Sequence, residues 1–140
     1  MSQQANATFA VKSWTETTWD GKPAAEVDGA KLSHAVVEYT YQGDIQGQST
    51  IHYVMNYNAD GSGQFVALEY FTGSIGGKSG SVVFQQVGTF EPVTATLTVL
   101  SGSGTGELAG LRGESHISIP GHMEQYPFTL NYHFEQPQEA

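Results

Sequence analysis

Glu69 is the residue of this sequence with the clearest potential for chemistry. In a stretch of period two it shares one face of a predicted strand with apolar side chains, namely Phe65, Ala67 and Phe71. A carboxyl group in apolar surroundings has a raised pKa and can act as a general acid or base. We therefore predict that Glu69 is a catalytic residue inside the fold. The alternative is a Glu69 at the rim or in solvent, hydrogen bonded to Gln85 or a tyrosine.

Four further side chains are candidates for holding the polar end of a bound molecule. Gln85 lies across the 76–80 turn from Glu69, where its amide could orient the carboxylate or a ligand carbonyl. The pattern around Gln85 does not show which face of its strand it occupies. The other candidates are tyrosines at predicted inward positions, whose hydroxyls need a partner when buried: Tyr39, Tyr53 and Tyr132. Core packing is the alternative role of each tyrosine.

Motifs of metal-binding and cofactor-binding proteins are incomplete. No His-x-His pair shares a strand face, and four of the five histidines fall on outward positions, so we expect no metal site: these are His34, His52, His116 and His133. The stretch 72–79 resembles a P-loop, but Thr72 stands where the first glycine is required and a strand follows. The glycines of 104–110 do not fit the dinucleotide-binding spacing. We expect no cofactor.

Charge and composition limit the partners and the compartment. The net charge of −9 opposes binding to phosphate backbones, so we expect no nucleic-acid partner. The longest apolar run, 65–68, is far shorter than the ~20 residues of a membrane span. The chain has no cysteine, and its N-terminus lacks the basic and apolar regions of a secretory signal. We therefore expect a cytoplasmic protein.

The elements that must position these residues are short strands separated by turns. Seventeen glycines and many β-branched and aromatic residues favour strands over helices. Alternation predicts strands at 8–14, 31–41, 49–58, 64–73, 81–90, 92–100, 115–119 and 126–134, with a long loop at 15–30 and one helical turn near 107–111. About eight strands can close an antiparallel barrel, and we predict an all-β, eight-stranded barrel as one domain over residues 1–140. A two-sheet sandwich has the same pattern.

The outward face of the strand at 64–73 is also apolar. It carries Val66, Leu68 and Tyr70. A strand that is apolar on both faces is typical of one that is covered on both sides. We therefore expect this face to pack against another subunit of a homo-oligomer.

Three spaced segments resemble a known bacterial family. They are GDIQG at 43–47, FVALEYFTGSIGGKSGSVVFQQVGTF at 65–90, and SGTGELAGLRGE at 103–114. Together they resemble DUF3224, a family of uncharacterised proteins, over nearly the whole chain. The resemblance implies a barrel similar to those of allene oxide cyclases and dirigent proteins, and it implies no established activity.

Three functional hypotheses follow. The favoured one is a barrel that binds a small apolar molecule, with Glu69, Gln85 and a tyrosine at its polar end. The second is an isomerase or cyclase-like enzyme in which Glu69 moves a proton or stabilises positive charge. The third is a filled barrel that only supports oligomerisation through the Val66, Leu68 and Tyr70 face.

Overall fold

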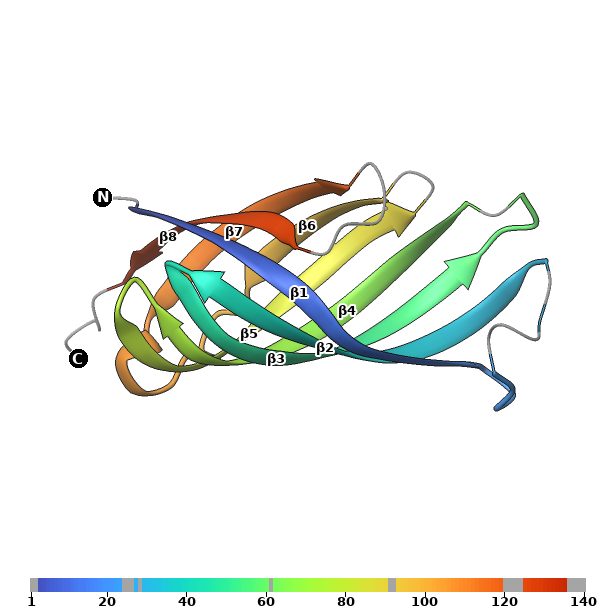
Figure 1. Cartoon of the computed structure of the whole chain (residues 1–140), viewed down its shortest axis with the longest axis horizontal. Coiled ribbons are helices and arrows are strands. Elements are labelled where there is room, and N and C mark those ends of the chain that lie inside the picture. The colour runs from blue at the N-terminus through green and yellow to red at the C-terminus, as the bar shows by residue number, and fades with distance from the viewer. Residues whose placement is uncertain are drawn as a thin grey trace.

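The chain folds into a closed barrel of antiparallel strands. The structure, a computed structural model, describes residues 3–23, 27, 29–60, 62–90, 93–119 and 125–135. Each strand pairs with the next along the chain, and the last pairs with the first (Figure 1). The predicted eight-stranded barrel is confirmed, and the sandwich is wrong. The strands are β1 (Gln3–Thr18), β2 (Lys31–Gly43), β3 (Ile45–Tyr57), β4 (Gly63–Ile75), β5 (Lys78–Phe90), β6 (Val93–Val99), β7 (Leu111–Ile119) and β8 (Tyr126–Phe134).

Side chains alternate between the inside of the barrel and solvent as the sequence period requires. In β4 the odd-numbered residues from 65 to 71 are buried and the even-numbered ones are exposed. The predicted inward set, which includes Glu69, therefore does lie inside. No described helix is long and apolar enough to cross a membrane.

The first strand differs most from the prediction. β1 continues to Thr18, so the expected loop at 15–30 begins too early. Thr15, Thr17 and Thr18 are β-branched and favour strand, whereas the first strong turn signal, Asp20-Gly21, comes later. The pairing of β1 with β2 shifts between Val11 and Ser13. Such a bulge reverses the simple alternation of inward and outward side chains beyond it.

A pair of glycines lets β3 and β4 approach closely. Gly47 pairs with Gly73, and Gly47 has a φ of 145°. A Cβ at Gly47 would lie 2.3 Å from the backbone oxygen of Thr72, so no other residue fits without a shift of the strands. Gly47 also pairs with Tyr41, a buried residue that reaches the candidate site. The glycines thus allow the strands to bend beside that tyrosine.

The two ends of the barrel are paired to different extents. β1 pairs with β8 only through Gln3–Phe9, and β7 pairs with β8 only through Leu111–Glu114. Beyond Phe9, β1 no longer pairs with β8. On that edge of β1 the described residues form one isolated β-bridge, between Thr17 and Pro23. Figure 1 shows the strands fanning apart at the end opposite the two termini. We call this the open end.

Candidate functional site

Glu69 lies at the centre of the candidate site. Its side chain has no exposed surface, and its carboxyl group accepts three hydrogen bonds from neighbouring strands. Tyr41 and Ser49 donate to Oε2, the latter at 2.6 Å, and the Gln86 amide donates to Oε1 at 2.7 Å. All three donors are neutral, so no cation compensates the charge of the ionised carboxylate.

The network continues from Glu69 toward the open end. The oxygen of the Gln86 amide accepts a 3.4 Å hydrogen bond from the Tyr53 hydroxyl. The hydroxyls of Tyr53 and Tyr39 are 2.6 Å apart and share a hydrogen bond. The structure therefore brings together three of the predicted residues, Glu69, Tyr39 and Tyr53, in one buried polar network. Gln86 is the link between the carboxyl group and the two tyrosines.

Burial controls the protonation of these groups. Loss of solvent raises the pKa of the Glu69 carboxyl group, although its hydrogen bonds to Ser49, Tyr41 and Gln86 oppose the shift. Burial also raises the pKa of Tyr41 well above its usual value, and the nearby Glu69 adds to that effect. The tyrosines therefore remain neutral donors, and burial favours the protonated form of Glu69 more than in a carboxyl group exposed to water.

Gln85 is not part of this network. It is exposed on the outer face of β5, where it pairs with Leu68, whereas its neighbour Gln86 is buried. The face of Gln85, which the pattern left open, is the outer one, so Gln85 is not placed to orient the Glu69 carboxylate, and its neighbour Gln86 takes that position. The pattern left this face open because the run Val82-Val83-Phe84 is apolar on both faces and hides the period of the strand.

Tyr132 is buried but lies elsewhere. Its hydroxyl donates to Gln3 Oε1 at 3.4 Å, and a Cβ at Gly76 would lie 2.3 Å from that hydroxyl. Gln3, the β4–β5 turn and the end of β8 all belong to the end of the barrel that carries the termini. The structure thus separates Tyr132 from the Glu69 network.

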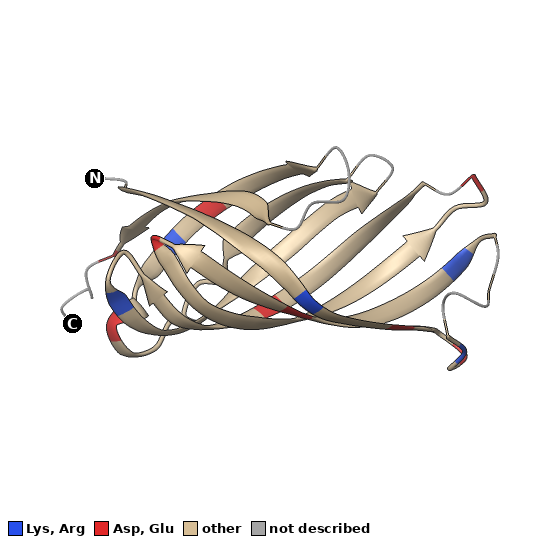
Figure 2. Cartoon of the chain, in the orientation of Figure 1, with Lys and Arg blue, Asp and Glu red and all other residues tan. Residues whose placement is uncertain are grey.

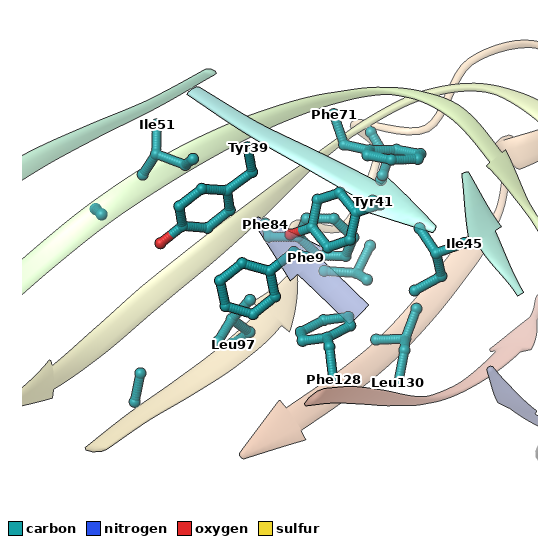
Figure 3. Close-up of a cluster of buried hydrophobic side chains, with 14 of the residues drawn as sticks. Phe9, Tyr39, Tyr41, Ile45, Ile51, Phe71, Phe84, Leu97, Phe128 and Leu130 are labelled. Atoms are coloured by element: carbon teal, nitrogen blue, oxygen red, sulfur yellow. The ribbon is translucent and has the colours of Figure 1, made fainter. Parts of the chain in front are cut away.

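Aromatic rings fill the middle of the barrel (Figure 3). Phe9 stacks on Tyr39 with ring centroids 4.5 Å apart, and Tyr41 packs edge-on against Phe71 at 5.5 Å and against Phe128 at 5.7 Å. These contacts enclose Glu69 on the side of the termini. Any molecule that approaches the network must therefore come from the open end or displace aromatic rings.

A second set of aromatic side chains leads from the network to the open end. Trp14 is 50% exposed and stacks on Tyr53 with centroids 5.7 Å apart. Tyr53 packs edge-on against Phe65 at 5.3 Å, and Phe65 lies parallel to Phe90 at 6.2 Å. We call these four residues the aromatic path. Its rings contact one another in sequence from the half-exposed Trp14 through the buried Tyr53 and Phe65 to Phe90.

Glu16 is a further polar group near the path. Its Oε2 accepts hydrogen bonds from Ser33 at 2.6 Å and Tyr57 at 2.7 Å, and its Oε1 accepts one from the Trp14 indole at 3.0 Å. Glu16 therefore fixes the orientation of Trp14 over Tyr53. The Tyr57 ring in turn packs against Phe90, with centroids 4.7 Å apart.

Sequence reasoning missed several of these residues. Tyr41 lies two residues from Tyr39 on the same strand face, and the alternation of Phe84 with Gln86 indicates the correct glutamine. Ser49 stands at the predicted start of its strand, but β3 begins four residues earlier, at Ile45. Ser49 therefore lies within the strand, where its side chain faces the interior. Trp14 could not be found by period, because the bulge in β1 changes its face.

Two histidines contact each other on the outer surface. His34 Nε2 and His52 Nδ1 are 3.1 Å apart on neighbouring strands. Within the described ranges, no three His, Asp or Glu side chains are placed to hold a metal ion together.

Fold and site define a class: an antiparallel barrel that contains a buried carboxyl–amide–tyrosine network. The sequence profile of a family described as a protein of unknown function, DUF3224, matches residues 5–132. A similar solved structure is that of a protein with unknown function from the DUF3224 family of Shewanella oneidensis MR-1. It has a TM-score of 0.80 and 27% identity, and the match covers 97% of this chain and 100% of that one. No curated protein matches.

The chain belongs to the DUF3224 family. The predicted resemblance is confirmed, and the family description assigns no activity.

Proposed function

We propose that this protein binds a small, uncharged, apolar or aromatic molecule in the open end of its barrel. The observation that carries the proposal is the half-exposed Trp14 ring stacked on Tyr53. A large aromatic side chain left in solvent beside other aromatic rings is typical of a surface that contacts a ligand. The molecule would pack along the aromatic path.

The polar network supplies the fixed end of this site. Tyr53 belongs to both the polar network and the aromatic path, and its hydroxyl is hydrogen bonded to Tyr39 and Gln86. A ligand carbonyl or hydroxyl at this point would hydrogen bond to the Tyr53 hydroxyl, whose position is already fixed by its partners. Apolar walls with a few fixed polar groups are the usual composition of small-molecule sites.

The neutral fluorescent probe N-phenyl-1-naphthylamine tests the proposal. A titration should show saturable binding, and Trp14→Ala should weaken it about tenfold, since aromatic contacts contribute about 1 kcal/mol or more beyond their buried area. The matched control is Trp19→Ala, because Trp19 is 71% exposed in the loop after β1 and should leave the affinity unchanged. Absence of saturable binding, or equal loss in both variants, would contradict the proposal.

A second candidate function is proton-transfer isomerisation by Glu69. It is favoured by the raised pKa of a carboxyl group that has no cationic partner. The carboxylate would take a proton from one carbon of a bound molecule and return it to another, so the step needs no co-reactant. Glu69→Gln should then retain the affinity for the probe and abolish turnover of any unsaturated ketone found by screening. Turnover that survives the substitution would rule this candidate out.

A further inference from the structure

A row of valines crosses the outer surface of the barrel. Val54 pairs with Val66, and Val66 pairs with Val87, so the three side chains lie side by side on β3, β4 and β5. Their exposed fractions are 40%, 52% and 50%, and Leu32 and Leu68 extend the patch at 46% and 51%. We call these five residues the valine face. A shallow groove lies along it, lined by Leu32 and the three valines among others.

Around the valine face, the four strands β3 to β6 carry no Asp, Glu, Lys or Arg at their outward positions, and the flanking strands β2 and β7 carry the acidic residues Glu38 and Glu114. These outward positions are the even-numbered residues 48–56 of β3, 64–72 of β4 and 94–98 of β6, and the odd-numbered residues 83–89 of β5. In Figure 2 most charged residues lie instead toward the ends of the barrel. For a chain of net charge −9, such a face is unlike the rest of its surface.

This separation of charge favours a second copy of the chain as the partner. A cationic partner would be attracted to the acidic regions, and an anionic membrane or nucleic acid would need a basic patch. Another copy is equally acidic and can approach with least repulsion where both surfaces are uncharged. The polar groups around the valines are amides and hydroxyls, such as Gln64, Gln85 and Thr96, which both donate and accept hydrogen bonds. Such groups can pair with themselves across a two-fold axis.

We propose that the valine face is the interface of a homodimer. The four strands span about 20 Å across the sheet and about 30 Å along it, an area of the order of the roughly 800 Å² per partner in a standard interface. A two-fold axis near Val66 would bring the same row of valines together from both copies. The barrel interior, with Trp14 and Glu69, would remain outside this interface.

The solution mass of the full-length protein tests the interface. Light scattering and sedimentation should give a dimer that dissociates on dilution over about a hundredfold range of concentration. Val66→Glu should give a monomer, because it buries two like charges without partners. Thr129→Glu adds the same charge on the exposed outer face of β8 and should remain a dimer. A wild-type monomer throughout the range, or a dimer that survives Val66→Glu, would overturn the proposal.

A second variant avoids any effect of the introduced charge on folding. Val66→Thr combined with Val87→Thr keeps β-branched side chains of nearly the same shape and should raise the dimer dissociation constant about tenfold or more. Circular dichroism should show the same strand content as the wild type. An unchanged dissociation constant in this folded variant would also overturn the proposal.

Discussion

Two adjacent glutamines on β5 have opposite surroundings, and this difference can be measured. Gln86 is buried and connects Glu69 with Tyr53, whereas Gln85 is exposed. Gln86→Leu removes a donor to the carboxyl group and an acceptor from the tyrosine, so we expect a loss of about 2 to 4 kcal/mol in the free energy of unfolding. Gln85→Leu should change it by less than about 0.5 kcal/mol. Urea unfolding of both variants checks the assignment, and equal effects would refute it.

Glu69 should make stability depend on pH. Its pKa in the folded protein lies above the ordinary value of 4.5, so the folded state holds this proton more tightly than the unfolded chain. Ionisation of Glu69 therefore lowers stability as pH rises from the unfolded-state pKa through the higher folded-state pKa, and has no such effect below that window. We expect this decline in the wild type and its absence in Glu69→Gln.

Urea unfolding from about pH 4 to about pH 8 measures this contribution as the difference between the two proteins. The glutamine can be accommodated if Gln86 turns its amide over, since its oxygen then accepts from the new amide and its nitrogen donates to Tyr53. A difference that does not change with pH would contradict the buried, cation-free environment of Glu69.

The sequence was informative about Glu69 because period two is clear in β4. Its interior position follows from Phe65, Ala67 and Phe71 alone. The partners of Glu69 lie on other strands, and their positions depend on the register between strands, which one sequence does not contain. The undetermined face of Gln85 shows the same limit within a single strand, since a run of apolar residues obscures the face of each residue.

At the scale of elements, the close approach of β3 and β4 depends on glycine. Gly47→Ala should lower the free energy of unfolding by about 3 kcal/mol, because backbone strain at positive φ and overlap with the Thr72 oxygen add together. Gly77→Ala is the control, since Gly77 also has positive φ, at 85°, but a Cβ there would meet nothing within 4 Å. It should cost about 1 to 2 kcal/mol.

Thermal or urea unfolding distinguishes the two glycine variants. If Gly47→Ala is no more destabilised than Gly77→Ala, the close approach of β3 and β4 does not restrict this position.

The eight strands themselves were predictable from alternation and turns. The extension of β1 and its bulge, which place Trp14 over Tyr53, could not be predicted in this way. They depend on contacts between distant parts of the chain.

The whole molecule has two apolar surfaces with different geometry. The aromatic path lies inside the open end, and the valine face lies outside on neighbouring strands. The alternation in the sequence indicated apolar residues on both faces of β4, but it did not indicate which surface would bind a small molecule. The shape of a barrel decides this, since a concave interior can surround a ligand and a convex exterior suits a second protein surface.

The central claim, a ligand site in the open end of the barrel, is tested most directly by amide and indole NMR spectra recorded during a titration with N-phenyl-1-naphthylamine. The chain has two tryptophans, so their indole signals can be assigned with one substitution. We predict that the Trp14 indole signal moves together with the amides of Tyr53 and Phe65, while the Trp19 signal stays in place. Shifts confined to Val54, Val66 and Val87, with Trp14 unaffected, would contradict the claim.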